Sequence, residues 1–155
     1  MTLPLRPLIV GESNPYQSDA ESGYCYAMFP EPENSAGGRL CRLIMRMNTH
    51  DYLRAFDRTN LCHGKWSVPR ARMRARELAA ERRDERLGLA SVIICCGVKV
   101  AVAFGLPTEP FKLYYAASPP TYVVLPHPSG LCRVWNELRA VERARDVLRQ
   151  AGLLL

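Results

Sequence analysis

The chain has 155 residues, of which 48% are hydrophobic and 23% are charged. This composition indicates one globular domain over residues 1–155 and excludes an intrinsically disordered chain. The net charge is +6, and only three of the 21 basic residues are lysine. A basic balance favours a polyanionic partner, although a mildly basic surface that only confers solubility would give the same total.

Short apolar runs alternate with stretches of helical periodicity along the chain. In chain order, the predicted elements are a strand at 7–11, helices at 36–47 and 49–56, a strand at 56–62, a helix at 68–88, a strand at 90–97, a helix at 98–105, a strand at 121–127 and a helix at 135–150. Alternating helices and fully apolar strands are typical of a parallel sheet covered on both faces. We therefore expect an α/β fold with a central, mainly parallel four-stranded sheet, in which Thr49 caps the second helix and Gly88 ends the third.

The helix predicted at 68–88 carries seven arginines and four acidic residues. We interpret most of these charges as a solvated, self-paired face and place no binding groove on it. Lys99, at the start of the next predicted helix, has apolar neighbours and is interpreted as a solvated or phosphate-contacting lysine.

No apolar stretch is long enough to span a bilayer, and the N-terminal residues lack the cleavage site of a signal peptide. We therefore expect a cytoplasmic protein, without membrane contact, whose thiols are reduced. The six cysteines contain no C-x-x-C pair, which disfavours a zinc site or an iron–sulfur cluster. They are Cys25, Cys41, Cys62, Cys95, Cys96 and Cys132. We expect no metal ion and no organic cofactor.

Unusual polar residues gather where the predicted strands end. The segments are GESNPYQ at 11–17, NLCHGKW at 60–66, CCGVK at 95–99 and HPSGLCR at 127–133. In open α/β sheets, ligands bind outside the carboxyl ends of the strands, so these segments predict the site.

Two of these segments resemble the signature motifs of the uracil-DNA glycosylase superfamily, namely GESNPY (11–16) after the first strand and HPSG (127–130) after the last. NLC (60–62) and the aromatic residue of FPEP (29–32) are similar to two further landmarks of that family, in the same order. The resemblance covers nearly the whole chain and implies a three-layer α/β/α sandwich. Asn14 stands where the best-known uracil enzymes carry Asp, and the first motif is one residue longer than theirs. The chain therefore resembles an outlying branch.

The resemblance implies catalytic roles for three residues. His127, held between Pro126 and Pro128, would donate a hydrogen bond to the anionic base that leaves the sugar. Asn14 would orient the attacking water, and Glu12 is the ionisable rival for that role. The alternatives are that His127 is a satisfied turn or core histidine and that Asn14 only forms a turn.

Base-binding and DNA-binding residues follow from the same resemblance. Asn60 would read a base edge, Phe29 would stack on the extruded base, and Tyr16 would close the pocket. The alternatives are a strand-end cap for Asn60 and ordinary packing for Phe29 and Tyr16.

The HPSG turn and the residues after it would contact DNA. Ser129 and Gly130 would lie against a phosphate, Arg133 would clamp another, and Leu131 would fill the gap left by a flipped base. The alternative for Leu131 is packing at the start of the helix that follows.

Together these residues predict a monomeric, monofunctional DNA glycosylase that removes a uracil-like or modified pyrimidine from single- or double-stranded DNA, in repair or in defence against phage DNA. It would leave an abasic site without cleaving the strand. A non-catalytic nucleic-acid-binding module of the same fold is the alternative, because fold alone does not decide function.

Overall fold

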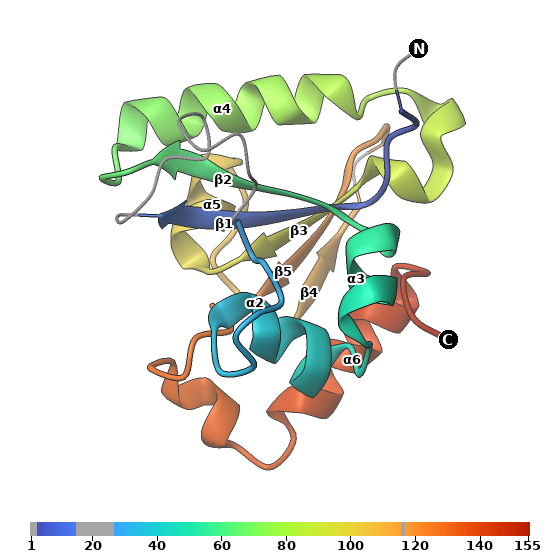
Figure 1. The fold of residues 1–155 in the computed structure, drawn as a ribbon. Helices are drawn as coiled ribbons and strands as arrows, with labels where there is room; N and C mark the ends of the chain where they lie inside the picture. The colour runs from blue at the N-terminus through green and yellow to red at the C-terminus, as the bar shows by residue number, and fades with distance from the viewer. Residues whose placement is uncertain (1–2, 15–26, 116) are drawn as a thin grey trace.

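In the structure, a computed structural model, residues 3–14, 27–115 and 117–155 are described. Five strands form one sheet in the order β2-β1-β3-β5-β4, in which β4 runs antiparallel to its neighbour and the others run parallel. The strands are β1 (Leu8–Asn14), β2 (Asp57–His63), β3 (Val92–Cys96), β4 (Lys112–Tyr114) and β5 (Thr121–Leu125). The predicted α/β fold with a mainly parallel central sheet is confirmed (Figure 1).

The strand that the sequence analysis does not count is β4, which lies at one edge of the sheet. Its three residues pair with β5, where Leu113 lies opposite Val123. A run of three residues is too short for apolar alternation to distinguish a strand from a loop. The pairing with β5 therefore defines this strand, and its own sequence does not.

Alternate side chains of the strands enter two separate cores. Ile9 and Ile94 point into one core, whereas Val10, Ile93 and Val124 point into the other. The first core is covered by α2 (Ala36–Gly38), the π-helix η1 (Arg39–Ile44), α3 (Thr49–Ala55) and α6 (Ala140–Gln150). The second is covered by α4 (Val68–Glu81) and α5 (Val98–Ala103). Figure 1 shows the resulting three layers, with α4 above the sheet and α2, α3 and α6 below it.

The single helix predicted at 36–47 is divided into the short α2 and the π-helix η1, and it ends at Ile44. Two other helices also begin differently from the sequence predictions. The N-cap of α3 is Asn48 instead of Thr49, because the Asn48 side chain accepts a hydrogen bond of 2.8 Å from the Asp51 amide. The last α-helix begins at Ala140, whereas Trp135 belongs to the preceding 3₁₀ turn η3 (Arg133–Asn136).

A further difference is the end of α4, which lies at Glu81 and not at Gly88. Arg82 turns into the protein, where it is 2% exposed and forms a 3.2 Å ion pair with Asp57 of β2. A buried ion pair fixes its partners strongly, because removing one leaves an uncompensated buried charge. Gly88 lies beyond this point in the 3₁₀ segment η2 (Glu85–Ser91).

None of the helices in the described part of the chain is both long enough and apolar enough to cross a membrane. The parallel strands β1, β2, β3 and β5 direct their carboxyl ends to one edge of the sheet, so the segments that follow them meet there.

Candidate functional site

The carboxyl ends of three strands converge on Gly97, the residue that follows β3. A Cβ atom at this position would lie 3.2 Å from Glu12 Oε1, 3.5 Å from His127 Cβ and 3.6 Å from His127 Cδ2. The Gly97 amide donates a 2.8 Å hydrogen bond to the Leu125 carbonyl, which joins β3 to the end of β5. Gly97 also has a φ of +115°, a conformation that favours glycine. The side chains of Glu12 and His127 thus come together around Gly97, which has no side chain.

His127 is partly buried, and its surroundings determine which form of the imidazole is present. Its Nδ1 accepts a hydrogen bond of 3.3 Å from the Ser129 backbone amide. Burial lowers the pKa of His127 below its usual value, and the negative charge of Glu12 partly opposes this effect. A neutral imidazole whose Nδ1 accepts carries its proton on Nε2, because only one ring nitrogen is then protonated. His127 therefore presents Nε2–H as a hydrogen-bond donor.

The backbone of the turn that carries His127 is fixed from two sides. The Trp135 indole donates a 2.8 Å hydrogen bond to the His127 carbonyl, and the Arg39 Nε donates a 3.0 Å bond to the Pro128 carbonyl. Pro126 and Pro128 are themselves buried. These contacts hold the imidazole in one place, so a partner would not have to order it on binding.

Asn60 lies on β2 directly beside Gly11 of β1, one residue before Glu12. It is only 6% exposed, and a Cβ on Gly11 would come within 2.5 Å of its Oδ1. Within the described part of the chain, no group forms a hydrogen bond to the Asn60 side-chain amide. A side-chain amide without a protein partner can bind a ligand that offers matching donors and acceptors. Asn60 is thus suited to bind a polar ligand edge.

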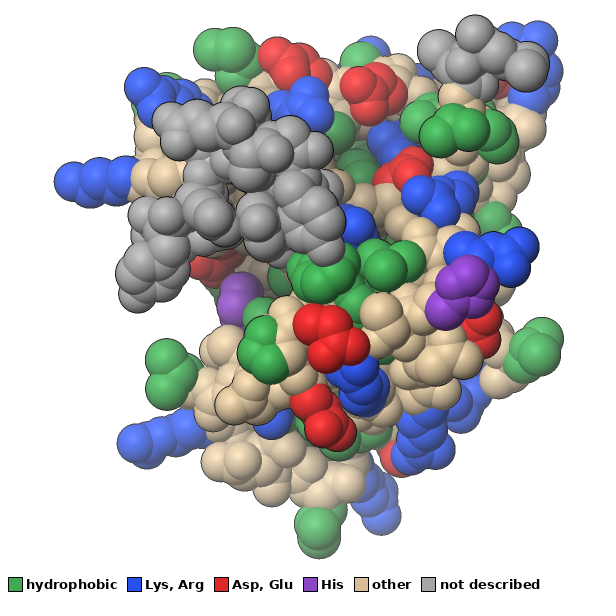
Figure 2. Space-filling view, in the orientation of Figure 1, with side chains coloured by type: hydrophobic (Ala, Val, Ile, Leu, Met, Phe, Trp, Pro, Cys, Tyr) green, Lys and Arg blue, Asp and Glu red, His purple; other side chains and the backbone are tan. Residues whose placement is uncertain are grey.

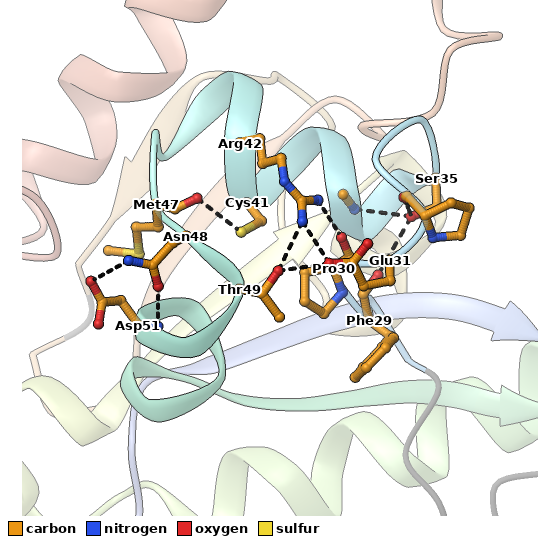
Figure 3. A network of polar contacts seen from close by, with 12 residues as sticks. Phe29, Pro30, Glu31, Ser35, Cys41, Arg42, Met47, Asn48, Thr49 and Asp51 are labelled. Carbon is orange, nitrogen blue, oxygen red and sulfur yellow. Dashed lines mark hydrogen bonds and ion pairs between the residues drawn. The ribbon is translucent and has the colours of Figure 1, made fainter.

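Phe29 comes from a segment that is held by the polar network of Figure 3. In this network, the Arg42 guanidinium donates to the Pro30 carbonyl and, at 2.6 Å, to Glu31 Oε1, and the Thr49 hydroxyl donates to the same Glu31 oxygen. The hydrogen bond from Thr49, with the one from Arg42, lowers the pKa of Glu31. Figure 3 shows the Phe29 ring pointing away from this network.

The ring of Phe29 lies against β2, where the guanidinium carbon of Arg58 is 5.5 Å from the ring centroid. Arg58 precedes Asn60 by two positions, so both side chains extend from the same face of β2. Phe29 and the Asn60 side chain therefore lie on the same face of the sheet, at β2.

The predicted DNA-binding residues follow directly after His127 and face solvent to different extents. Ser129 is partly exposed, whereas Gly130 and Arg133 are exposed. The Leu131 side chain is 92% exposed, so it does not pack at the start of the next helix. An exposed leucine beside an exposed arginine is compatible with the predicted wedge and phosphate contact.

Two of the predicted site residues cannot be placed in the same detail. Asn14 ends β1 in register with His63, but its side chain lies outside the described part of the structure, and so does all of Tyr16. The roles predicted for these two residues stay predictions.

Residues that the sequence analysis does not name also belong to the site. Gly97 is signalled only by its position after the most apolar strand, whereas Arg39 and Trp135 have no local signal at all. Arg39 additionally lines an open hollow of about 680 Å³, together with Pro32, Glu33, Asn34, Gly38, Arg42 and Leu43.

Within the described ranges, no three His, Cys, Asp or Glu side chains cluster in a way that could hold a metal ion. The cysteines nearest to the site are also poor nucleophiles, because burial raises the pKa of the Cys96 thiol to about 12. On the face shown in Figure 2, basic side chains are interspersed with acidic ones and do not form one continuous basic field.

The chain matches no protein-family model and no curated protein. The residues and their geometry must therefore carry the functional argument.

The pairing of Glu12 with His127 gives the first testable prediction. The carboxylate favours the imidazolium, so Glu12→Gln should lower the pKa of His127 further. NMR titration of the imidazole Cε1 proton measures this directly, with the titration curve of His50 on α3 as the internal control. An unchanged titration of His127 in Glu12→Gln would mean that the carboxylate does not act on this imidazole.

Proposed function

We propose that this protein is a monofunctional DNA glycosylase of the kind that the uracil-DNA glycosylase superfamily represents. It extrudes a uracil-like or modified pyrimidine from DNA and hydrolyses the N-glycosidic bond, leaving an abasic site. The observation that carries the proposal is the position of His127, whose Nδ1 accepts a hydrogen bond from the Ser129 amide and which stands on a fixed turn beside Glu12.

The chemistry needs a donor at the position where negative charge develops. When the bond between C1′ and the base nitrogen breaks, its electron pair goes to the base, and a water oxygen then forms the new bond to C1′. The Nε2–H of His127 donates to the resulting anionic carbonyl oxygen of the base. A donor that is already oriented stabilises this charge without the cost of reorganisation.

The Glu12 carboxylate, next to His127, assists the attack of water on the sugar. Glu12 can stabilise the positive charge that develops on the sugar, and it can accept a proton from the attacking water. Asn14 is an amide, which can orient that water but cannot act as a general base. We therefore propose that Glu12 and Asn14 divide this task at the end of β1.

We propose that residues on β2 and beside it recognise the base. The buried amide of Asn60 offers one donor and one acceptor edge, which is the pattern that a pyrimidine base presents. Phe29 provides a ring for stacking, which is worth roughly 1–3 kcal/mol per base. Tyr16 is proposed to close the pocket. Uracil and bulkier modified pyrimidines both remain candidates for the substrate.

DNA binding is proposed to follow the HPSG turn. Leu131 enters the stack where the base has left it, while Ser129, Gly130 and Arg133 contact the backbone. We also propose that the protein is a monomer. We place it in the cytoplasm, since the five described cysteines are free thiols, as is usual in a reducing compartment.

The proposed activity is tested by incubating the protein with DNA that contains uracil or a panel of modified pyrimidines. Free base and alkali-labile abasic sites should appear from at least one of these substrates. In single-turnover reactions, His127→Ala should then lower the rate by about a hundred- to a thousandfold, because one oriented donor to the leaving base is lost. His50→Ala, a histidine exposed on α3, is the matched control and should keep the wild-type rate. DNA binding without base release from any substrate would favour the non-catalytic module instead.

The wedge is tested with two leucines that are equally exposed. Leu131→Ala should slow base release from duplex DNA more than from single strands, since only a duplex leaves a gap to fill. Leu138, which is 101% exposed between η3 and α6, offers a matched control, and Leu138→Ala should affect neither substrate. If Leu131→Ala slows both substrates to the same extent, or if Leu138→Ala produces the duplex defect, Leu131 is not the wedge.

A further inference from the structure

A groove between α4 and α5 lies on the other face of the sheet from α2, α3 and α6, and the proposed reaction does not use it. It consists of two hollows of about 140 Å³ and about 180 Å³ that share Ala103 of α5 as a lining residue. The first hollow begins near the carboxyl edge of the sheet, where Val98 directly follows Gly97. The groove thus starts next to the candidate site and leads away from it along α4.

The floor of the first hollow is apolar and open to solvent. Val68, Val98 and Val102 line it and are 48%, 49% and 42% exposed. Ala71 and Trp66 complete this surface, and the Trp66 ring lies 5.6 Å from the Lys99 ammonium group. Apolar side chains that gather in a hollow, instead of being scattered singly, are typical of a binding surface.

The rim of the groove is basic. Arg72 and Lys99 line the first hollow, and Arg76 and Arg83 line the second. Among the described residues that line either hollow, none is acidic. Arg72 and Arg76 are four positions apart on α4 and therefore lie on one side of it, and Arg83 lies just beyond the end of this helix. These three arginines form a row beside the groove.

These arginines differ from three other arginines of residues 68–88, namely Arg74, Arg82 and Arg86, which form ion pairs. Arg74 pairs with Glu77, and Arg82 pairs with Asp57. For Arg72, Arg76 and Arg83, the described part of the structure contains no carboxylate within ion-pair distance. The self-paired face that the sequence analysis expects is therefore limited to one part of this segment, and the row beside the groove is left with its positive charge.

We propose that this groove binds an acidic amphipathic segment of a partner protein. An apolar cavity of about 150 Å³ takes up a benzene-sized group, so the first hollow can hold one leucine or phenylalanine side chain as an anchor. Acidic residues flanking that anchor would meet the cationic rim formed by Arg72, Arg76, Arg83 and Lys99. This combination of an apolar anchor and flanking charges is how amphipathic helices bind to grooves.

A protein segment fits this surface better than a nucleic acid does. Sites for single-stranded nucleic acids combine a basic groove with aromatic rings on which successive bases stack. The first hollow offers Trp66 as its single aromatic ring, and the remainder of its floor consists of valine and alanine side chains. In the second hollow, the rings of Phe104 and Tyr122 pack against each other, with centroids 5.4 Å apart and planes tilted by 55°, so they do not form a series of parallel stacking surfaces. Aliphatic side chains pack against other aliphatic or aromatic side chains, and this favours a peptide.

The test uses a short fluorescein-labelled peptide in which leucines and one phenylalanine repeat at helical spacing and all other positions are Glu or Asp. Fluorescence anisotropy should show binding to the full-length protein, and backbone amide shifts in NMR spectra should map the peptide to α4 and α5. A peptide with the same composition in scrambled order, and one with Lys at every acidic position, should each bind at least about tenfold more weakly.

Matched variants separate the groove from general charge and hydrophobicity. Arg76→Glu and Val102→Asp, both at exposed positions in the groove, should each weaken binding of the acidic peptide about tenfold or more. Arg74→Glu, at a half-buried position, and Met73→Asp, at an exposed one, make the same changes on α4 outside the hollows and should leave binding within about twofold. Thermal unfolding of all four variants confirms that they are folded.

Several results would overturn the proposal. These are no binding of the acidic peptide, equal binding of the scrambled or lysine peptide, or shift changes outside α4 and α5. If Arg76→Glu instead weakens binding of labelled DNA while Arg74→Glu does not, the groove is a nucleic-acid path and the proposal is wrong. None of these outcomes depends on base release, so they are separate from the test of the glycosylase.

Discussion

The parallel strands β1, β3 and β5 have their carboxyl ends close together. The side chains of Glu12 and His127 fit between them only because residue 97 is a glycine. Glu12, near the carboxyl end of β1, and His127, just beyond β5, both have atoms within 3.6 Å of the place where a Cβ at position 97 would stand. Any other residue would crowd the carboxylate and would also have to adopt a φ of +115°. The proposed chemistry depends on the close approach of the Glu12 carboxylate to the His127 imidazole. This approach is thus a consequence of the backbone geometry at the carboxyl end of the central strand β3.

The same contacts that fix the position of the imidazole also determine its chemistry. The Ser129 amide occupies Nδ1, burial disfavours the imidazolium, and the hydrogen bonds from Trp135 and Arg39 hold the turn. The charge of Glu12 partly opposes the effect of burial, and burial is the larger influence on the pKa of His127. A neutral donor that faces a developing anion stabilises the products of bond cleavage, whereas an isolated buried imidazolium would be costly to maintain.

The sequence predicts those parts of the structure that depend on local pattern. The run VIICC of β3 is apolar in every position and is buried in every position, and His127 stands in a motif whose resemblance can be recognised without a structure. Features that depend on distant contacts could not be predicted. α4 ends at Glu81, where Arg82 turns inward to pair with Asp57, and Asp84 then caps the 3₁₀ segment that follows. β4 exists because it pairs with β5, and the role of Gly97 depends on two side chains that are far from it in sequence.

The central claim is that His127 is neutral at physiological pH and carries its proton on Nε2. Long-range ¹H–¹⁵N correlation NMR of the folded protein distinguishes the two neutral tautomers from each other and from the imidazolium, because protonated and unprotonated ring nitrogens have different shifts. We expect an unprotonated Nδ1 and a protonated Nε2 in the free protein at neutral pH, with the hydrogen bond from the Ser129 amide as the cause. A proton on Nδ1, or an imidazolium at that pH, would contradict the account.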